Sequence, residues 1–215
     1  MRTHHLGVAA FIGAMLTAQV VFAGVSLPQS APRNLVSIVH GPNWIDLDGD
    51  GQKDLVVKAR YSAPNPSPHS FSVYSFNIFT NEDIGVGNRD IHWYVVSFPD
   101  LAPPIGRLEV TTGQGSDCMV RDIRLVLQRE QGKPPTAMVV QAERKVAGSY
   151  GDPETVTFTT YRLEKGSPKS PNEFAFIEVS REESKSRYCS VTEAFLKELG
   201  LPNPDSQSDP ETQSR

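Results

Sequence analysis

The chain has 215 residues, of which 38% are hydrophobic, and a formal net charge of −4 at pH 7. Such a length corresponds to one domain, or at most to two small ones. The net negative charge argues against nucleic acid or an anionic membrane surface as a binding partner.

Residues 1–23 have the features of a secretory signal peptide. A short basic start, MRTHH, precedes the apolar run LGVAAFIGAMLTAQVVF, and Val21 and Ala23 supply the small residues of a cleavage site. We expect cleavage after Ala23, a leader over residues 24–34, and a mature protein that is periplasmic or secreted. The alternative is an uncleaved N-terminal anchor, although spanning a bilayer takes roughly 20 apolar residues. No later segment is apolar enough to span a membrane.

From Leu35 onward the chain alternates between strand-like and turn-like segments. The strand-like segments are rich in Val, Ile, Phe, Tyr and Thr, and in chain order they are LVSIVHG, NWIDL, DLVVKARY, HSFSVYSFNIFT, IHWYVVSF, RLEVTT, CMVRDIRLVLQRE, TAMVVQAERKV, TVTFTTYRLEK and EFAFIEVSRE. Stretches rich in Gly, Pro, Asn and Asp separate them. This pattern is typical of an antiparallel β-sandwich or an open barrel. We therefore predict an all-β fold with one short C-terminal α-helix, in a single domain over residues 35–201.

The segment DLDGDGQKD, residues 46–54, places four aspartates within nine residues, and we call it the acidic loop. Its candidate ligands at calcium-loop spacing are Asp46, Asp48, Asp50, the backbone carbonyl of Gln52, and Asp54. Gly51 stands where such loops turn sharply. The twelfth position is Val57 instead of the bidentate Glu of an EF-hand, and the flanking segments are strand-like. The loop is therefore not an EF-hand.

The acidic loop resembles the nine-residue loops of FG-GAP and related extracellular repeats, in which D-x-D-G-D-G-x-x-D-L joins two strands. Those families stack several copies of the motif, whereas this chain has one copy. We expect a structural Ca²⁺ ion, because a hard cation suits oxygen ligands and would hold together a hairpin that like charges splay apart. The alternative is a metal-free Asp/Gly turn whose carboxylates accept hydrogen bonds from backbone amides.

Aromatic residues gather around the acidic loop and in the two strand-like segments that follow it. Trp44 precedes the loop, and Trp93 lies in IHWYVV. In an all-β domain most aromatic residues lie in the core or in cross-strand pairs. Exposed on one sheet face, they would instead form a platform for a carbohydrate or a protein partner. Trp44 and Trp93 are therefore the candidate ligand-contacting aromatics.

The chain has two cysteines, Cys118 and Cys189, and both follow the predicted signal peptide. In an oxidising compartment an even pair is most simply one disulfide. Closing a loop of about 70 residues would stabilise the fold by roughly 4 kcal/mol on the chain-entropy model. The alternative is two free thiols, one of them reactive.

One segment, SVTEAFLKELGLP, has the pattern of a helix. Ser190 and Glu193 form a capping box at its start, and Gly200 and Pro202 end it. Residues 202–215 have almost nothing apolar to bury, and we expect them to be a disordered tail.

Sequence motifs of catalysis are absent. The histidines that follow the predicted signal peptide, His40, His69 and His92, are far apart and lack zinc-site spacing. Neither G-x-S-x-G nor S-x-x-K occurs. A glycosidase pair cannot be chosen among the many carboxylates by sequence alone. The chain is therefore predicted not to be an enzyme.

Several segments together resemble one family. An exported β-rich chain, DLDGDGQKDLVVKARY, HSFSVYSF, Cys118 within GSDCMVRDIRLVL, and YCSVTEAFLKELGL near the end are similar to the CarG-type carbapenem self-resistance proteins. The resemblance covers most of the predicted domain. It implies a periplasmic β-sandwich that protects the cell from carbapenem without the machinery of a hydrolase, and it carries over no catalytic residue.

Three functional hypotheses follow. The first is an exported, non-enzymatic binding or protection protein with a structural calcium loop, whose partner is a carbapenem-type small molecule or an envelope protein. The second is a secreted carbohydrate-binding or glycan-processing β-sandwich, which Trp44, Trp93 and the spare carboxylates favour. The third is a purely structural envelope or adhesion module. The residues indicate no particular oligomeric state.

Overall fold

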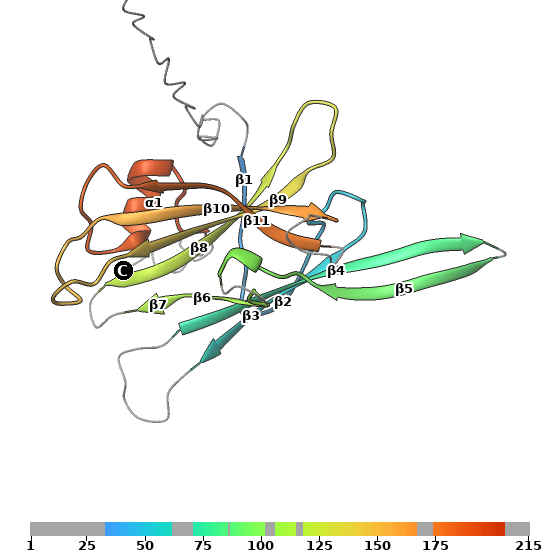
Figure 1. The fold of residues 1–215 in the computed structure, drawn as a ribbon, viewed down its shortest axis with the longest axis horizontal. Helices are drawn as coiled ribbons and strands as arrows, with labels where there is room; N and C mark the ends of the chain where they lie inside the picture. The colour runs from blue at the N-terminus through green and yellow to red at the C-terminus, as the bar shows by residue number, and fades with distance from the viewer. Residues whose placement is uncertain are drawn as a thin grey trace, which may run out of the picture.

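A computed structural model describes residues 33–61, 71–85, 87–101, 106–114, 118–166 and 174–204. The predicted signal peptide, most of the leader and the tail beyond Pro204 lie outside the described residues. Two antiparallel sheets and one short α-helix make up most of the described part (Figure 1). No helix there combines the length and the apolar character that crossing a bilayer requires.

The first sheet contains most of the C-terminal half of the chain. Its strand order is β1-β8-β9-β10-β11, and β7 also pairs with β8. The bounds are β1 (Arg33–Val36), β7 (Gly113–Gln114), β8 (Met119–Gln128), β9 (Thr136–Arg144), β10 (Val156–Lys165) and β11 (Phe174–Glu183). The N-terminal strand β1 therefore crosses over to join a sheet built from the second half of the chain.

The second sheet is a meander of order β2-β3-β4-β5, and β6 pairs with the start of β4. Its strands are β2 (Gly41–Ile45), β3 (Asp54–Tyr61), β4 (Phe71–Gly85), β5 (Asn88–Val95) and β6 (Val110–Thr111). A 3₁₀ turn, η1 (Pro99–Leu101), follows β5. The acidic loop is the connection between β2 and β3.

The main hydrophobic core lies between the two sheets. Phe76 of the second sheet and Phe176 of the first are both fully buried, and their ring centroids lie 5.1 Å apart. Phe98, after β5, stacks on Phe176 at 4.9 Å. Burying such large rings supplies much of the free energy that holds the sheets together. The structure confirms the β-sandwich prediction, and the sheets do not close into a barrel in the part described.

A second core lies on the opposite face of the first sheet, under the helix α1 (Val191–Leu199). Val191, Ala194 and Phe195 are completely buried there, and the ring of Phe195 lies 5.7 Å from that of Phe158 on β10. Strands β8 and β9 are consequently covered on both faces. This explains why RLVL and AMVV lack the apolar–polar alternation of a half-exposed strand.

The predicted helix is confirmed, and both ends are capped. The side chain of Ser190 accepts a hydrogen bond from the amide of Thr192 at 3.3 Å, and Gly200 adopts the left-handed conformation at the C-cap, with φ 65°. The carboxylate of Glu193 pairs with Lys197 at 2.7 Å. Directly before the N-cap, Cys189 forms the predicted disulfide with Cys118, with the Cα atoms 5.7 Å apart. The bond joins the start of α1 to the start of β8.

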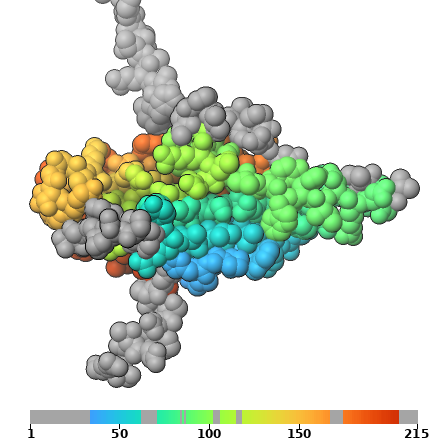
Figure 2. All heavy atoms as spheres, turned by 90° about the horizontal axis from the view of Figure 1, so that it is seen from below, coloured from blue at the N-terminus to red at the C-terminus, as the bar shows by residue number. Residues whose placement is uncertain are grey.

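The hairpin of β4 and β5 extends beyond the body of the sandwich as an arm (Figures 1 and 2). Residues 88–93 of β5 are all exposed, because the first sheet does not cover this end of the second. On the arm, Nε2 of His92 lies 2.6 Å from a carboxylate oxygen of Asp90. The arm is therefore held by β-pairing and cross-strand contacts more than by a core.

Candidate functional site

The acidic loop brings three carboxylates together. Each of Asp46, Asp48 and Asp50 places one carboxylate oxygen within 4.8 Å of the other two. The three aspartates are the one such group of potential metal ligands among the described residues. A divalent cation placed between them would offset their mutual repulsion. The arrangement can therefore hold a metal ion.

Backbone amides also reach these carboxylates. Asp46 accepts hydrogen bonds from the amides of Gly49 at 2.8 Å and Gly51 at 3.1 Å. Asp48 accepts one from Asp50, and Asp50 accepts one from Gln52 at 2.7 Å. Because a carboxylate oxygen has several acceptor positions, these bonds order the loop without using up its capacity to bind a cation.

Asp54 is placed differently from the other three aspartates. It is fully buried, and its two oxygens accept hydrogen bonds from the amides of Leu47 at 2.7 Å and Phe79 at 2.9 Å. It thus joins the acidic loop to β4 and lies outside the group of three. The side chain of Gln52 points back to Asp50, where its Nε2 donates to Oδ2 at 2.8 Å.

Burial and crowding both act on the ionisation of this loop. Burial, together with the nearby charges of Asp50 and Asp46, raises the pKa of Asp48 above its usual range. Burial raises the pKa of Asp54 to about 6, although the two amide hydrogen bonds oppose the shift. Binding of a cation or a proton would therefore stabilise the crowded carboxylates of this loop.

The acidic loop also packs against the opposite sheet. The carbonyl oxygen of Leu47 accepts a hydrogen bond from the amide of Ala137 on β9 at 2.8 Å, and the side chain of Leu47 is fully buried in the main core. Gly49 lies directly against Pro134 and Pro135, with no room for a side chain. A cation bound in the loop would consequently hold a contact between the two sheets.

The two tryptophans lie together on the outer face of the second sheet. Trp44 is 56% exposed and Trp93 is 46% exposed, and their ring centroids are 6.0 Å apart in an edge-to-face arrangement. Trp93 also contacts the ring of Phe79. Tyr74 and Phe76 are core residues and Trp93 forms a cross-strand pair with Phe79, as expected for most aromatics of a β domain, whereas Trp44 and Trp93 both remain exposed.

A cleft of about 570 Å³ lies beyond the edge of the hydrophobic core, on the inner face of the first sheet, which is the face that meets the second sheet. We call it the basic cleft, because its lining includes the cations Arg121, Arg144, Lys145 and Arg181 and the single acidic residue Glu143. Gln141 lies on its floor, 7% exposed, and its Oε1 has no hydrogen-bond partner among the described residues. Sequence reasoning missed this cleft.

Each cation of the basic cleft already has a partner. Lys145 pairs with Glu183 at 3.1 Å, and Arg144 donates hydrogen bonds to the backbone carbonyls of Tyr150 and Asp152. Arg121 pairs with Glu143, and Arg181 donates two hydrogen bonds to Glu178 at 3.0 and 2.7 Å. Burial, with the nearby charge of Glu178, raises the pKa of Tyr161 to about 12. The Tyr161 hydroxyl is therefore protonated at neutral pH and can donate a hydrogen bond, but it is not poised to act as a nucleophile or base.

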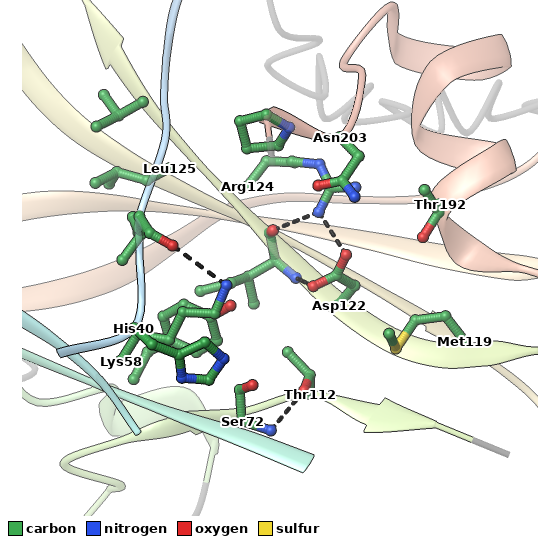
Figure 3. Close-up of a pocket in the computed structure, with 15 residues that line it drawn as sticks. His40, Lys58, Ser72, Thr112, Met119, Asp122, Arg124, Leu125, Thr192 and Asn203 are labelled. Atoms are coloured by element: carbon green, nitrogen blue, oxygen red, sulfur yellow. Dashed lines mark hydrogen bonds and ion pairs between the residues drawn. The ribbon is translucent and has the colours of Figure 1, made fainter. Parts of the chain in front are cut away.

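A smaller pocket of about 160 Å³ lies at an edge of the first sheet (Figure 3). Strand β8 pairs with β1 from Leu125 onward and with β7 at Arg121 and Met119, so residues 122–124 have neither strand beside them. We call this gap the Arg124 pocket. Its wall includes Arg124, Asp122 and Ile123 of β8, Lys58 and Ser72 of the second sheet, and Thr192 of α1.

Two signals in the sequence could have indicated these cavities. Arg124 interrupts the apolar strand DIRLVL, and Gln141 interrupts MVVQA. A long polar side chain within a strand buried on both faces is unusual and needs a partner. The histidines, by contrast, do not converge: His40 lines the Arg124 pocket, His92 lies on the arm, and His69 is outside the described residues.

No protein-family model matches this sequence, and no match is found among curated proteins. Among solved structures, the crystal structure of CarG is similar to this chain, with a TM-score of 0.57 and 20% sequence identity. The similarity covers 79% of this chain and 98% of that chain. At this identity the likeness concerns the fold, and at that level it confirms the resemblance to CarG inferred from the sequence.

Proposed function

We propose that this chain is an exported, non-enzymatic protein that protects by binding a small molecule of the carbapenem type in the basic cleft. The resemblance of the sequence to the CarG-type carbapenem self-resistance proteins motivates the choice of ligand class, and the CarG-like fold agrees with that resemblance. The disulfide supports export, because such bonds persist in oxidising compartments such as the periplasm or the extracellular space.

The observation that carries this proposal is the size and lining of the basic cleft. Its volume of about 570 Å³ lies within the range of sites that enclose drug-sized ligands. Four cationic residues line the cleft, and three of them pair with the carboxylates of Glu143, Glu178 and Glu183. A ligand carboxylate, such as that of a carbapenem, would bind by exchanging with one of these carboxylates. Gln141 and Tyr161 on the inner face are suited to orient a ligand by hydrogen bonds.

The lining also favours binding over catalysis. The described residues that form the cleft include neither a serine nor a cysteine, and the hydroxyl groups come from Thr157, Thr159 and two tyrosines. Hydrolysis by a covalent route would need a nucleophile activated by an adjacent base. We therefore propose that the protein sequesters the ligand and does not convert it.

We further propose that the acidic loop holds a structural Ca²⁺. Three carboxylates at oxygen-ligand spacing support it, and extracellular calcium is abundant enough for a weak site. The loop contacts β9 at Ala137, near the first residue of that strand, whereas Glu143 of the basic cleft lies near its last residue. The ion would accordingly stabilise the sandwich without contacting the ligand.

The proposal is tested by calorimetric titration of a carbapenem into the protein purified after export, with β-lactam absorbance followed in parallel. We expect saturable binding without loss of the β-lactam. The variant Arg181→Ala should weaken binding at least tenfold. Arg162→Ala is the matched control, since it breaks an exposed Arg–Glu pair on the neighbouring strand that does not line the cleft. Catalytic consumption of the carbapenem, or equal binding by both variants, would contradict the proposal.

A second candidate function rests on the exposed tryptophan pair. Trp44 and Trp93 form a continuous aromatic surface on a sheet face, and such rings contact sugars through their apolar faces. Under this alternative the chain is a carbohydrate-binding module. A glycan array distinguishes the two: specific hits lost in Trp93→Ala would favour the alternative, and an array without hits would remove its support.

A further inference from the structure

The outer edge of the arm is a strand edge without a neighbour. Strand β5 (Asn88–Val95) pairs with β4 on one side, and no other strand of the described chain pairs with it on the other (Figures 1 and 2). All its residues except Tyr94 are exposed, and none is a proline. Natural proteins usually shorten or cover such an edge, because its free N–H and C=O groups attract a further strand. The edge of β5 is therefore open to a partner strand.

The register of the arm shows which backbone groups lie on this free edge. The amide of Val96, directly after β5, donates to the carbonyl of Phe76 on β4 at 2.8 Å. Successive residues of a strand alternate between bonding to one neighbour and facing the other side. The even-numbered residues of β5 consequently bond to β4. The residues that turn their N–H and C=O groups to the free edge are Arg89, Ile91, Trp93 and Val95.

The free edge has a limit at each end. Toward the body of the sandwich, the carbonyl of Ser97 accepts a hydrogen bond from the amide of Phe176 at 2.8 Å, so β11 covers the edge from there on. At the tip of the arm, Gly85 and Gly87 both have positive φ, and the hairpin turns back between β4 and β5. A partner strand can therefore pair only along the segment from about Gly87 to Val95.

We propose that this edge pairs antiparallel with the same edge of a second copy of the chain, about a two-fold axis at Ile91. A two-fold axis uses the same surface on both copies. In this register Gly87 of one copy lies beside Val95 of the other, directly before the position that β11 covers. The pairing thus uses the whole free edge without a collision. An axis at Trp93 would instead place Arg89 of the second copy beside Ser97, where β11 already lies.

The side chains of β5 complement one another across this axis. Residues directly opposite in an antiparallel pair point to the same face and interact. Ile91 faces Ile91 of the second copy, and Asp90 faces His92, the same residue type combination that lies 2.6 Å apart within each chain. Arg89 faces the exposed ring of Trp93, on which a guanidinium can stack. An axis at Asp90 or at His92 would instead place two carboxylates or two imidazoles opposite each other.

The proposed pairing joins the second sheets of two copies into one continuous sheet. Ile91 with its symmetry mate, and Arg89 with Trp93 in both directions, are hydrogen-bonded pairs that exchange two bonds each, about six bonds in all. No residue of β5 lines the basic cleft, so the pairing is independent of the function proposed for that cleft.

Sedimentation velocity of the exported protein over a range of concentrations tests the pairing. We expect a reversible equilibrium between monomer and dimer. Ile91→Lys should weaken dimerisation at least tenfold, because it places two like charges opposite each other at the axis. Leu196→Lys is the matched control: Leu196 is 55% exposed, against 56% for Ile91, but it lies on α1. This variant adds the same charge and should dimerise as the parent does.

An exchange of charges tests the register. Asp90→Lys places a cation opposite His92, and His92→Asp places a carboxylate opposite Asp90, so each variant alone should dimerise weakly. An equimolar mixture of the two should form heterodimers, since the introduced ammonium group then faces the introduced carboxylate.

Hydrogen exchange distinguishes pairing of edges from stacking of sheet faces. The amides of Ile91 and Trp93 lie on the free edge, and their exchange should slow as the protein concentration rises. A chain that stays monomeric at all concentrations, equal dimerisation of Ile91→Lys and Leu196→Lys, a mixture without heterodimers, or a dimer in which the Ile91 amide stays unprotected would each overturn the proposal.

Discussion

The carbonyl oxygen of Leu47 accepts a hydrogen bond from the amide of Ala137, and this bond joins the acidic loop of one sheet to the second residue of strand β9 in the other. Leu47 lies between two potential metal ligands, Asp46 and Asp48, and its own side chain is completely buried. Any event that orders or splays the acidic loop is therefore transmitted to the packing of the sandwich. Metal binding and global stability should be linked.

The first prediction concerns this linkage. Saturating Ca²⁺ should raise the melting temperature relative to EDTA, and Asp48→Asn should remove most of that rise. In EDTA the same variant should be as stable as the parent or slightly more stable, because it relieves repulsion from Asp46 and Asp50. Differential scanning calorimetry with and without Ca²⁺ measures both effects.

A matched control for this substitution lies on the arm. Asp83 also accepts a hydrogen bond from a nearby backbone amide, that of Gly85 at 2.9 Å, but it is exposed and distant from the acidic loop in the chain. Asp83→Asn should keep the full response to Ca²⁺. An equal response in Asp48→Asn and the parent would show that the acidic loop is a metal-free turn.

The second prediction compares two glycines of the loop. Both have positive φ, +82° at Gly49 and +87° at Gly51. A Cβ atom at Gly49 would lie 2.5 Å from the carbonyl oxygen of Pro135, whereas one at Gly51 would meet nothing within 4 Å. Gly51→Ala should therefore cost about 1–2 kcal/mol of unfolding free energy from backbone strain alone.

Gly49→Ala should cost a further 1–3 kcal/mol or so, because the added methyl group must push the loop away from β9 and its preceding turn. Urea unfolding in EDTA measures both variants without interference from metal binding. Equal losses for the two alanine variants would mean that the loop does not pack tightly against Pro134 and Pro135.

The third prediction concerns pH. The pKa of Asp54 is raised from 3.8 to about 6 by burial, so folding disfavours its ionised form. Its contribution to stability is fully present below the unfolded-state pKa and is lost as pH rises through about 6. The raised pKa of Asp48 acts in the same direction. In EDTA the urea concentration at the unfolding midpoint should therefore decrease as the pH is raised from 4 to 7.

Asp54→Asn isolates this effect. The variant should be less stable than the parent, since an amide –NH₂ would face the backbone N–H of Leu47 or Phe79 where an acceptor is required. Its urea midpoint should nevertheless depend less on pH over the same range. An undiminished pH dependence in the variant would assign the titration to another group.

The fourth prediction concerns the disulfide between Cys118 and Cys189, which closes a loop with a sequence separation of 71 residues. Replacing both cysteines by serine should lower the unfolding free energy by about 4 kcal/mol on the chain-entropy model. Because the bond lies directly before the N-cap Ser190, hydrogen exchange should speed up most in α1. Uniform acceleration across both sheets would instead indicate that the bond acts only on the unfolded chain.

Features that depend on neighbours in the chain were predictable from the sequence. The limits of α1 follow from Ser190 at one end and Gly200 at the other, because caps act within one turn of the helix. The grouping of Asp46, Asp48 and Asp50 follows from their alternate spacing around a turn. The cysteine pairing followed from having two cysteines and a predicted signal peptide, which made one disulfide the simplest expectation.

Features that join distant segments were decided by the tertiary structure. Leu47 contacts Ala137, and Lys58 lines a pocket with Arg124, only because the sheets stack in one particular register. The exposure of Trp44 and Trp93 likewise depends on which face of the second sheet meets the first. Alternation along a strand defines two faces but does not say which of them is covered. Packing of the two sheets and α1 makes that choice, and it thereby creates both the basic cleft and the Arg124 pocket.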